Sequence, residues 1–283
     1  MTIINESYLN TFIDISLQED SGDGDHTSLA CIPAESEGMA NLIIKQDGIL
    51  AGMETAEKIF ERTDKNLEMI PYLEDGRQIK AGNIAFLVKG KTQSILKAER
   101  LVLNVMQRMS GIATQTHNYV KAIEGLNAVI LDTRKTTPGM RLLEKAAVKA
   151  GGGENHRMGL YDMIMIKDNH KFYAGGIEKA IKAVKKYLTD KKKTLKIEVE
   201  AHSLEEVKEI MNIGGIDMIL LDNFSINETR EAVKIISGRC KTESSGGITM
   251  DTVREYAECG VDYISVGALT HQIKSLDMSL KAI

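Results

Sequence analysis

Charged side chains or glycines follow six short apolar runs in the second half of this 283-residue chain. The groups are Asp132-Thr133-Arg134-Lys135, Lys167-Asp168, Glu200, Asp222, Ser245-Gly246-Gly247 and Gly267-Ala268. Arginine and lysine bind carboxylates and phosphates, and glycine lets backbone N–H groups approach a phosphate. Paired carboxylates can hold Mg²⁺ or ribose hydroxyls. These residue types predict an enzyme that binds a phosphorylated sugar together with an anionic second substrate.

A basic set of five side chains lies within or between these groups. Its members are Arg134, Lys135, His156, Arg157 and Lys167. Any one of them alone would more often pair with a surface carboxylate than bind a ligand. Because all follow a predicted strand or the glycine turn at residues 151–153, we expect the set to converge on one anion pocket.

The carboxylates and glycines at the other strand ends leave alternatives open. Glu200 and Asp222 could be salt-bridge partners of neighbouring basic residues as readily as Mg²⁺ or ribose ligands. The loops at 245–247 and 267–268 each precede a predicted helix, and the last two strands of α/β barrels commonly carry the phosphate site. We therefore favour a phosphate site over simple turns at these two loops.

The apolar runs that position these groups are typical of strands buried on both faces of a parallel sheet. They occupy residues 128–131, 163–166, 195–199, 218–221, 239–243 and 263–266. Amphipathic segments near 139–150, 176–188, 203–213, 226–237 and 249–259 separate them. This alternation predicts an α/β barrel with six strands rather than eight, whose function collects at the C-terminal strand ends.

The first half of the chain mixes strands and helices without strict alternation, which predicts a small α+β domain. We expect helices at residues 1–20 and 51–62 and strands at 39–50 and 84–89. A long helix at 94–124, in which Gly111 could introduce a kink, follows them. The change of domain is expected near this helix.

Composition narrows the classes of protein. The formal net charge of −4 argues against a general nucleic-acid binder. The first 44 residues carry eight acidic and no basic residues, whereas residues 132–171 carry eight Lys/Arg against five Asp/Glu, which suits a small anion. We expect neither a membrane span nor a signal peptide. The three cysteines form no CxxC pair and predict reduced thiols in the cytoplasm. His26, His117, His202 and His271 show no metal-ligand spacing.

The segment DTRKTTPGMRLLEKAAVKAGGGENHRMGLYDMIMIKDNH at 132–170 closely resembles the quinolinate phosphoribosyltransferase family, also called decarboxylating nicotinate-nucleotide pyrophosphorylases. Other matching pieces, in family order, are EDSGDGDHTS (19–28), AERLVLNVMQRMSGIAT (98–114), IEVEAHSLEE (197–206), ILLDNF (219–224), ESSGGI (243–248) and GVDYISVGALTH (260–271). HSLEE, after Glu200, differs in detail from the family pattern.

The resemblance implies an N-terminal α/β sandwich at residues 1–112 and an incomplete α/β barrel at 113–283. A C-terminal helix at 270–283 is expected to pack back on the sandwich. The implied reaction converts quinolinate and phosphoribosyl pyrophosphate, with Mg²⁺, to nicotinate mononucleotide, pyrophosphate and CO₂, a step of de novo NAD biosynthesis.

The resemblance also implies roles for individual residues. Arg134, His156, Arg157 and Lys167 would bind the quinolinate carboxylates, with Thr133 beside them, and Lys135 would lie between the substrate and the pyrophosphate. Glu200 and Asp222 would face ribose and Mg²⁺. The 5′-phosphate would meet Ser245, Gly246, Gly247, Val266, Gly267 and Ala268, with His271 nearby. Arg100 would enter the site from the neighbouring subunit, which implies a homodimer and leaves hexamers open.

Three other functions compete with this one. The nearest is a paralogue with the same fold, of the molybdenum-utilisation type or a nicotinate-specific phosphoribosyltransferase. The dense cationic set favours a dicarboxylate over the monocarboxylate nicotinate. A Schiff-base aldolase using Lys167 as nucleophile is a second enzyme class, disfavoured by the surrounding cations. A non-catalytic phosphate-binding protein would be expected to lack some of the charged strand ends, and none is missing.

Overall fold

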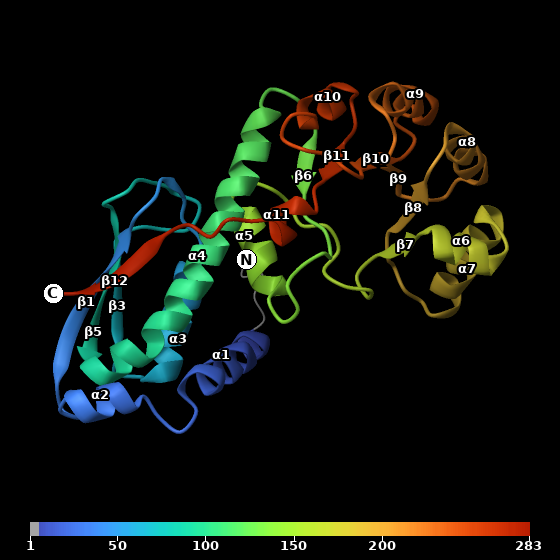
Figure 1. Ribbon diagram of the computed structural model, residues 1–283. Helices are drawn as coiled ribbons and strands as arrows, with labels where there is room; N and C mark the ends of the chain where they lie inside the picture. The colour runs from blue at the N-terminus through green and yellow to red at the C-terminus, as the bar shows by residue number, and fades with distance from the viewer. Residues whose placement is uncertain (1–5) are drawn as a thin grey trace. The chain divides into compact units, whose positions relative to one another are not determined.

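The chain is organised as two compact units, each built from separate stretches of sequence (Figure 1). The computed structural model describes residues 6–283. The first unit contains residues up to 117 together with 136–152 and 268–283, and the second contains 118–135 and 153–267. The predicted boundary at residue 112 lies near the first crossing. Residues 136–152 and 268–283, which the sequence analysis places in the second domain, belong to the first unit.

The first unit combines helices with an antiparallel sheet. Its elements are α1 (Glu6–Ser21), α2 (His26–Cys31), β1 (Glu37–Ile44), β2 (Gly48–Ile49), α3 (Met53–Thr63), β3 (Glu68–Pro71), β4 (Gln78–Ile79), β5 (Ile84–Lys91), α4 (Thr92–Ala122, up to residue 117), α5 (Arg141–Ala150), α11 (Ala268–His271) and β12 (Met278–Ala282). The main sheet has the order β12-β1-β5-β3, and β2 pairs with β4. Residues 1–5 of the first predicted helix lie outside the described part of the chain.

The C-terminal segment corrects one prediction. Instead of a helix over 270–283, the chain forms the short α11 and then strand β12, which pairs antiparallel with β1 in the register Leu42↔Leu280. The free edge of β1 supplies backbone partners that a terminal helix could not use. Within residues 6–283, no helix is long and apolar enough to cross a membrane.

The second unit is built on six parallel strands. They are β6 (Val129–Leu131), β7 (Ile164–Ile166), β8 (Ile197–Ala201), β9 (Met218–Asp222), β10 (Lys241–Ser245) and β11 (Tyr263–Ser265). The helices are α6 (Asp168–Ala174), α7 (Ile177–Asp190), α8 (Leu204–Ile213), α9 (Ile226–Ile236) and α10 (Val253–Glu258). The strand order β6-β11-β10-β9-β8-β7 confirms the six-stranded, incomplete barrel.

The outward faces of these strands hold the apolar core of the second unit. Val199 and Ala201 of β8 and Leu221 of β9 are buried in one cluster with residues of α7, α8 and α9. Side chains alternate between the two faces of a strand, so the residues between these positions point into the barrel. Glu198 and Glu200 of β8 are such residues, which explains why a buried strand carries carboxylates.

A short segment continues the sheet beyond β6. Glu154 forms a parallel bridge with Leu131, its N–H donating to the Ile130 carbonyl at 2.8 Å. The buried Asp132 carboxylate then accepts from the His156 N–H at 2.9 Å and from Asn155 Nδ2 at 2.5 Å. These bonds fix the backbone that carries His156 and Arg157.

Helix α4 runs through Gly111 without interruption, and this glycine meets another part of the first unit. A Cβ atom at Gly111 would lie 2.4 Å from the main-chain oxygen of Lys274. The glycine is therefore required by close packing of the segment between α11 and β12 on the helix.

We predict that Gly111→Ala destabilises the protein by about 1–3 kcal/mol, because the added methyl group overpacks a backbone contact. The intrinsic helix preference alone would favour alanine by about 1 kcal/mol. Urea denaturation followed by circular dichroism measures the difference. Asn104→Ala at an exposed position of α4 is the matched control and should cost nothing; an equally stable Gly111→Ala variant would contradict the packing argument.

Candidate functional site

The C-terminal ends of neighbouring parallel strands bring most of the predicted site residues together. Lys167 follows β7, Glu200 lies in β8, Asp222 ends β9 and Ser245 ends β10, in the order of the sheet. Gly267 follows β11, the next strand along. Parallel pairing aligns these ends, as the sequence predicted.

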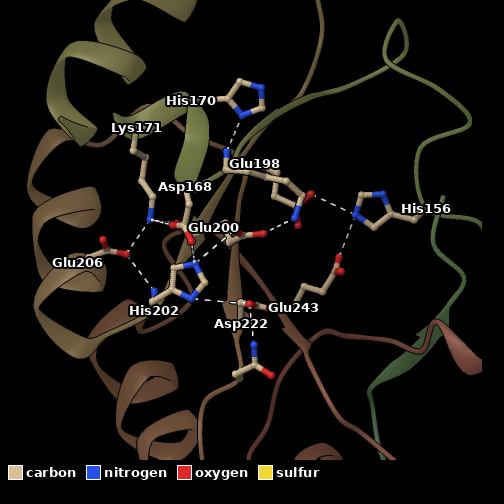
Figure 2. A network of polar contacts seen from close by, with 12 residues as sticks. His156, Asp168, His170, Lys171, Glu198, Glu200, His202, Glu206, Asp222 and Glu243 are labelled. Atoms are coloured by element: carbon tan, nitrogen blue, oxygen red, sulfur yellow. Dashed lines mark hydrogen bonds and ion pairs between the residues drawn. The ribbon is translucent and has the colours of Figure 1, made fainter. Parts of the chain in front are cut away.

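His202 lies at the centre of an acidic cluster at these strand ends (Figure 2). Its Nε2 is 2.7 Å from Asp168 Oδ2 and 3.3 Å from Glu200 Oε1, and its Nδ1 is 3.6 Å from Asp222 Oδ2. Asp168, Glu200 and His202 are close enough to ligate one ion. Histidine spacing in the sequence gave no sign of this group, because its members come from different strand ends.

Lys167 pairs with the buried carboxylate of Glu200. The sequence analysis assigns Lys167 to the anion pocket and Glu200 to ribose and Mg²⁺. In the structure these two residues form an ion pair with each other. An arriving cation at Glu200 would compete with this lysine, and release of the lysine would leave an ammonium group for an anionic ligand.

Lys171 of α6 supports this cluster from inside the protein. Its side chain is 8% exposed, and its Nζ lies 3.1 Å from the Glu200 carbonyl oxygen and 2.9 Å from both Asp168 Oδ1 and Glu206 Oε2. The hydrogen bond from Lys171 is the main cause that lowers the pKa of Asp168. Glu206 Oε2 also accepts from the His202 N–H at 2.9 Å, so one ammonium group orders the ends of β7 and β8.

Two of the predicted cationic residues, Arg134 and Arg157, come from the loop after β6 and from the segment before β7. Arg134 is exposed in the loop after β6, where the Lys135 N–H donates to Thr133 Oγ1 at 3.0 Å. Arg157 is half-buried, and its Nη1 donates to the Met163 carbonyl at 3.3 Å. Burial is the main cause that lowers the pKa of Arg157, and the charge of Arg134 lowers it further. Guanidinium groups of this kind favour the binding of an anion.

His156 lies deeper than the sequence suggested. Its Nε2 is 3.1 Å from Glu198 Oε2 and 3.2 Å from Glu243 Oε2, and both glutamates are fully buried (Figure 2). Burial and then the Glu243 charge raise the pKa of Glu198 to about 7. Burial lowers the pKa of His156, but the two carboxylates raise it on balance. The Arg157 N–H donates to Nδ1 at 2.7 Å, so a proton on Nε2 faces the carboxylates.

The two predicted phosphate loops differ from each other. Ser245 ends β10 and helix α10 begins only at Val253, so residues 245–247 do not open a helix, whereas the single turn α11 begins at Ala268 as predicted. Gly246 has φ of +97° and a Cβ there would lie 2.3 Å from Asn223 Oδ1. The loop after β10 is therefore shaped by its contact with the loop after β9. The Val266 N–H is bonded to the Leu131 carbonyl at 3.0 Å.

Three predicted site residues, Arg100, Ala268 and His271, belong to the first unit. Arg100 is exposed on α4, and His271 is exposed at the end of α11. The Ala268 carbonyl accepts from Gln115 Nε2 at 2.7 Å. Their roles stay predictions.

A cavity of about 500 Å³ reaches the N-terminal side of the same strands. His156 and Arg157 line it, together with Lys196, Lys241 and Tyr263 at or beside strand starts. Lys241 is already paired with Asp262 at 2.5 Å. Within the barrel, Arg157 therefore borders open space into which a ligand could extend.

Comparison with known proteins matches two family models to successive parts of the chain. The family described as "Quinolinate phosphoribosyl transferase, C-terminal domain" matches residues 112–281, and its N-terminal counterpart matches 25–110. A tobacco protein (Nicotiana tabacum) named "Quinolinate phosphoribosyltransferase [decarboxylating] 2b, mitochondrial" is 45% identical, covering 96% of this chain and 82% of the relative. A Bacillus subtilis protein named "Probable nicotinate-nucleotide pyrophosphorylase [carboxylating]" is 41% identical, covering 98% and 94%.

Solved structures agree with these relatives. The nicotinate-nucleotide pyrophosphorylase of Francisella tularensis superimposes with a TM-score of 0.93 at 38% identity, covering 99% of this chain and 98% of that one. At this level both the fold and the family are shared.

We predict that Lys171→Met destabilises the protein by about 1–3 kcal/mol, because it leaves Glu206 and Asp168 without their buried partner. Thermal unfolding at neutral pH measures the change. Lys182→Met is the matched control, since Lys182 pairs with Glu178 on an exposed helix surface and should contribute little. Equal effects of the two substitutions would show that Lys171 does not hold the cluster.

Proposed function

The chain belongs to the quinolinate phosphoribosyltransferase family, and from this premise we propose that it converts quinolinate and phosphoribosyl pyrophosphate to nicotinate mononucleotide, pyrophosphate and CO₂. One observation carries the proposal beyond the relationship. The second unit carries an exposed Arg134, a half-buried Arg157 and an acidic group around Glu200. A dicarboxylate and a ribose that becomes cationic need these two environments.

The charges of the site suit the chemistry of ribosyl transfer. The sugar becomes oxocarbenium-like as pyrophosphate leaves, so carboxylates near it lower the barrier by electrostatic stabilisation. Glu200 and Asp222 are the carboxylates that we assign to this role, and Lys135 is assigned to the departing pyrophosphate. The pyridine nitrogen of quinolinate is already a nucleophile, so no activated serine or cysteine is needed.

The cationic side chains also contribute to the decarboxylation, because they hold the carboxylates of quinolinate. Quinolinate carries two carboxylates, and Arg134 and Arg157 can each hold one through paired hydrogen bonds. Once the ring nitrogen carries the ribose, the ring is cationic and stabilises the carbanion left by CO₂. The protein then contributes chiefly orientation. We place the 5′-phosphate at the loops of Ser245–Gly247 and Val266–Ala268.

The donor atoms at the strand ends fit Mg²⁺. This ion prefers carboxylate oxygens and keeps several waters. Glu200 is buried with a carboxylate oxygen directed at the cluster, and Asp222 is half-buried on the other side of His202. We assign Glu200 and Asp222 as the residues that would hold the ion. Bound there, Mg²⁺ would neutralise the charge of the pyrophosphate leaving group.

We further propose a homodimer in which Arg100 of one subunit completes the site of the other. Its support is the exposure of Arg100 on α4 and its place in the segment that resembles the family. Assembly into hexamers stays a prediction. So does the cytoplasmic location, which rests on the three free cysteines; the tobacco relative is named mitochondrial.

We predict that the protein consumes quinolinate only when phosphoribosyl pyrophosphate and Mg²⁺ are both present, followed by the absorbance of the pyridine product. Nicotinate should not replace quinolinate, because one guanidinium would be left unpaired in the site. Omission of Mg²⁺ with added chelator is the control. Turnover of nicotinate but not quinolinate would instead support the nicotinate-specific enzyme.

We predict that mixing Arg100→Ala subunits with Lys135→Ala subunits restores activity to about a quarter of the wild-type value after subunit exchange. Half of the random dimers are mixed, and each mixed dimer has one intact site. A mixture of Lys135→Ala with Glu200→Ala is the control, since both residues lie on the barrel of one subunit and no intact site can form. Absence of rescue in exchanged dimers would contradict a shared site.

A further inference from the structure

Two carboxylates inside the barrel have no part in the proposed reaction. Glu198 and Glu243 are 0% exposed, and one oxygen of each lies at 3.1 and 3.2 Å from His156 Nε2. Burying a carboxylate costs several kcal/mol unless it is compensated. Two buried glutamates beside one imidazole are less favourable for stability than apolar side chains would be. We therefore look for a role of Glu198 and Glu243 other than stability.

The imidazole between them controls the backbone of Arg157. Its Nε2 contacts the two carboxylates, and its Nδ1 accepts the Arg157 N–H at 2.7 Å. The His156 N–H is held separately by Asp132. With both ends of the ring engaged, the ring has one orientation, and that orientation fixes the N–H direction of the next residue.

The two carboxylates also connect this segment to the rest of the site (Figure 2). Glu198 stands two residues before Glu200 on β8, and Glu243 stands two residues before Ser245 on β10. Residues two apart on a strand point to the same face. The contacts of His156 with Glu198 and Glu243 therefore fix the position of the segment that carries Arg157 along β8 and β10. This position is fixed relative to Glu200 and Ser245, the residues assigned to ribose and phosphate.

We propose that Glu198 and Glu243 are positioning residues for the dicarboxylate substrate: they hold the His156 ring inside the barrel, and the ring aims the Arg157 guanidinium. This assignment rests on the proposed function. It gives His156 the role of the link between the glutamates and Arg157, because its Nε2 faces the glutamates and its Nδ1 accepts the Arg157 N–H. Phosphoribosyl pyrophosphate binding does not depend on this contact.

The test replaces each glutamate by leucine, of similar volume and without charge. In Glu243→Leu and in Glu198→Leu, we expect the KM and Kd for quinolinate to rise tenfold or more, since a misplaced charged group can cost a large factor. The KM for phosphoribosyl pyrophosphate should stay within about twofold. Stability should stay close to that of the wild type, because the remaining glutamate still pairs with His156.

Two further variants separate positioning from simple damage to the core. Glu243→Gln keeps the size and an accepting oxygen, and should recover most of the quinolinate affinity. In an Arg157→Ala background, Glu243→Leu should cause little further loss, because both substitutions act through the same guanidinium. Isothermal titration with quinolinate measures each Kd.

The possible results divide clearly. Unchanged quinolinate affinity in a folded leucine variant, equal loss for both substrates, or additive losses with Arg157→Ala would each overturn the positioning role. Should one leucine variant fail to fold, the other glutamate gives the same comparison. If the wild-type protein does not turn over quinolinate, the proposed function fails instead, and this outcome is visible before any variant is made.

Discussion

The structure of the second unit depends on one constraint, the alternation of side chains along short parallel strands. The outward positions of β8 and β9 pack as apolar residues under α7, α8 and α9. The inward positions are thereby forced to share a narrow interior, where polar groups must meet one another. Glu198, Glu200 and Asp222 are inward residues of this kind. The chemistry of the site is thus a consequence of how the core is packed.

Much of this arrangement could be predicted from the sequence, because it follows local rules. Apolar runs bounded by charged groups predicted six parallel strands, and their C-terminal ends meet as expected. The terminal strand β12 could not be predicted, since its pairing with β1 depends on a partner far away in the sequence. His202 was missed for the same reason, as its carboxylate neighbours follow other strands. A carboxylate in the buried run LKIEV was a signal for Glu198 that the periodicity argument passed over.

The site balances charges that would otherwise be costly. Lys167 neutralises Glu200, and Lys171, on the buried side of the cluster, neutralises Asp168 and Glu206. Burial and then the charge of Arg134 lower the pKa of Arg157, while the charges of Glu198 and Asp162 act against this shift. A dianionic substrate beside Arg157 would also favour its charged form.

The pairing of β12 with β1 also has a consequence for how the protein is made. Residues 37–44 leave the ribosome long before residues 278–282, so one edge of the first sheet has no partner while most of the chain is synthesised. An unpaired strand edge is a template for wrong pairing with other chains. Sheet completion in the first unit therefore waits until residues 278–282 have been translated, and loss of a few residues near 280 would disturb a domain whose other strands are translated much earlier.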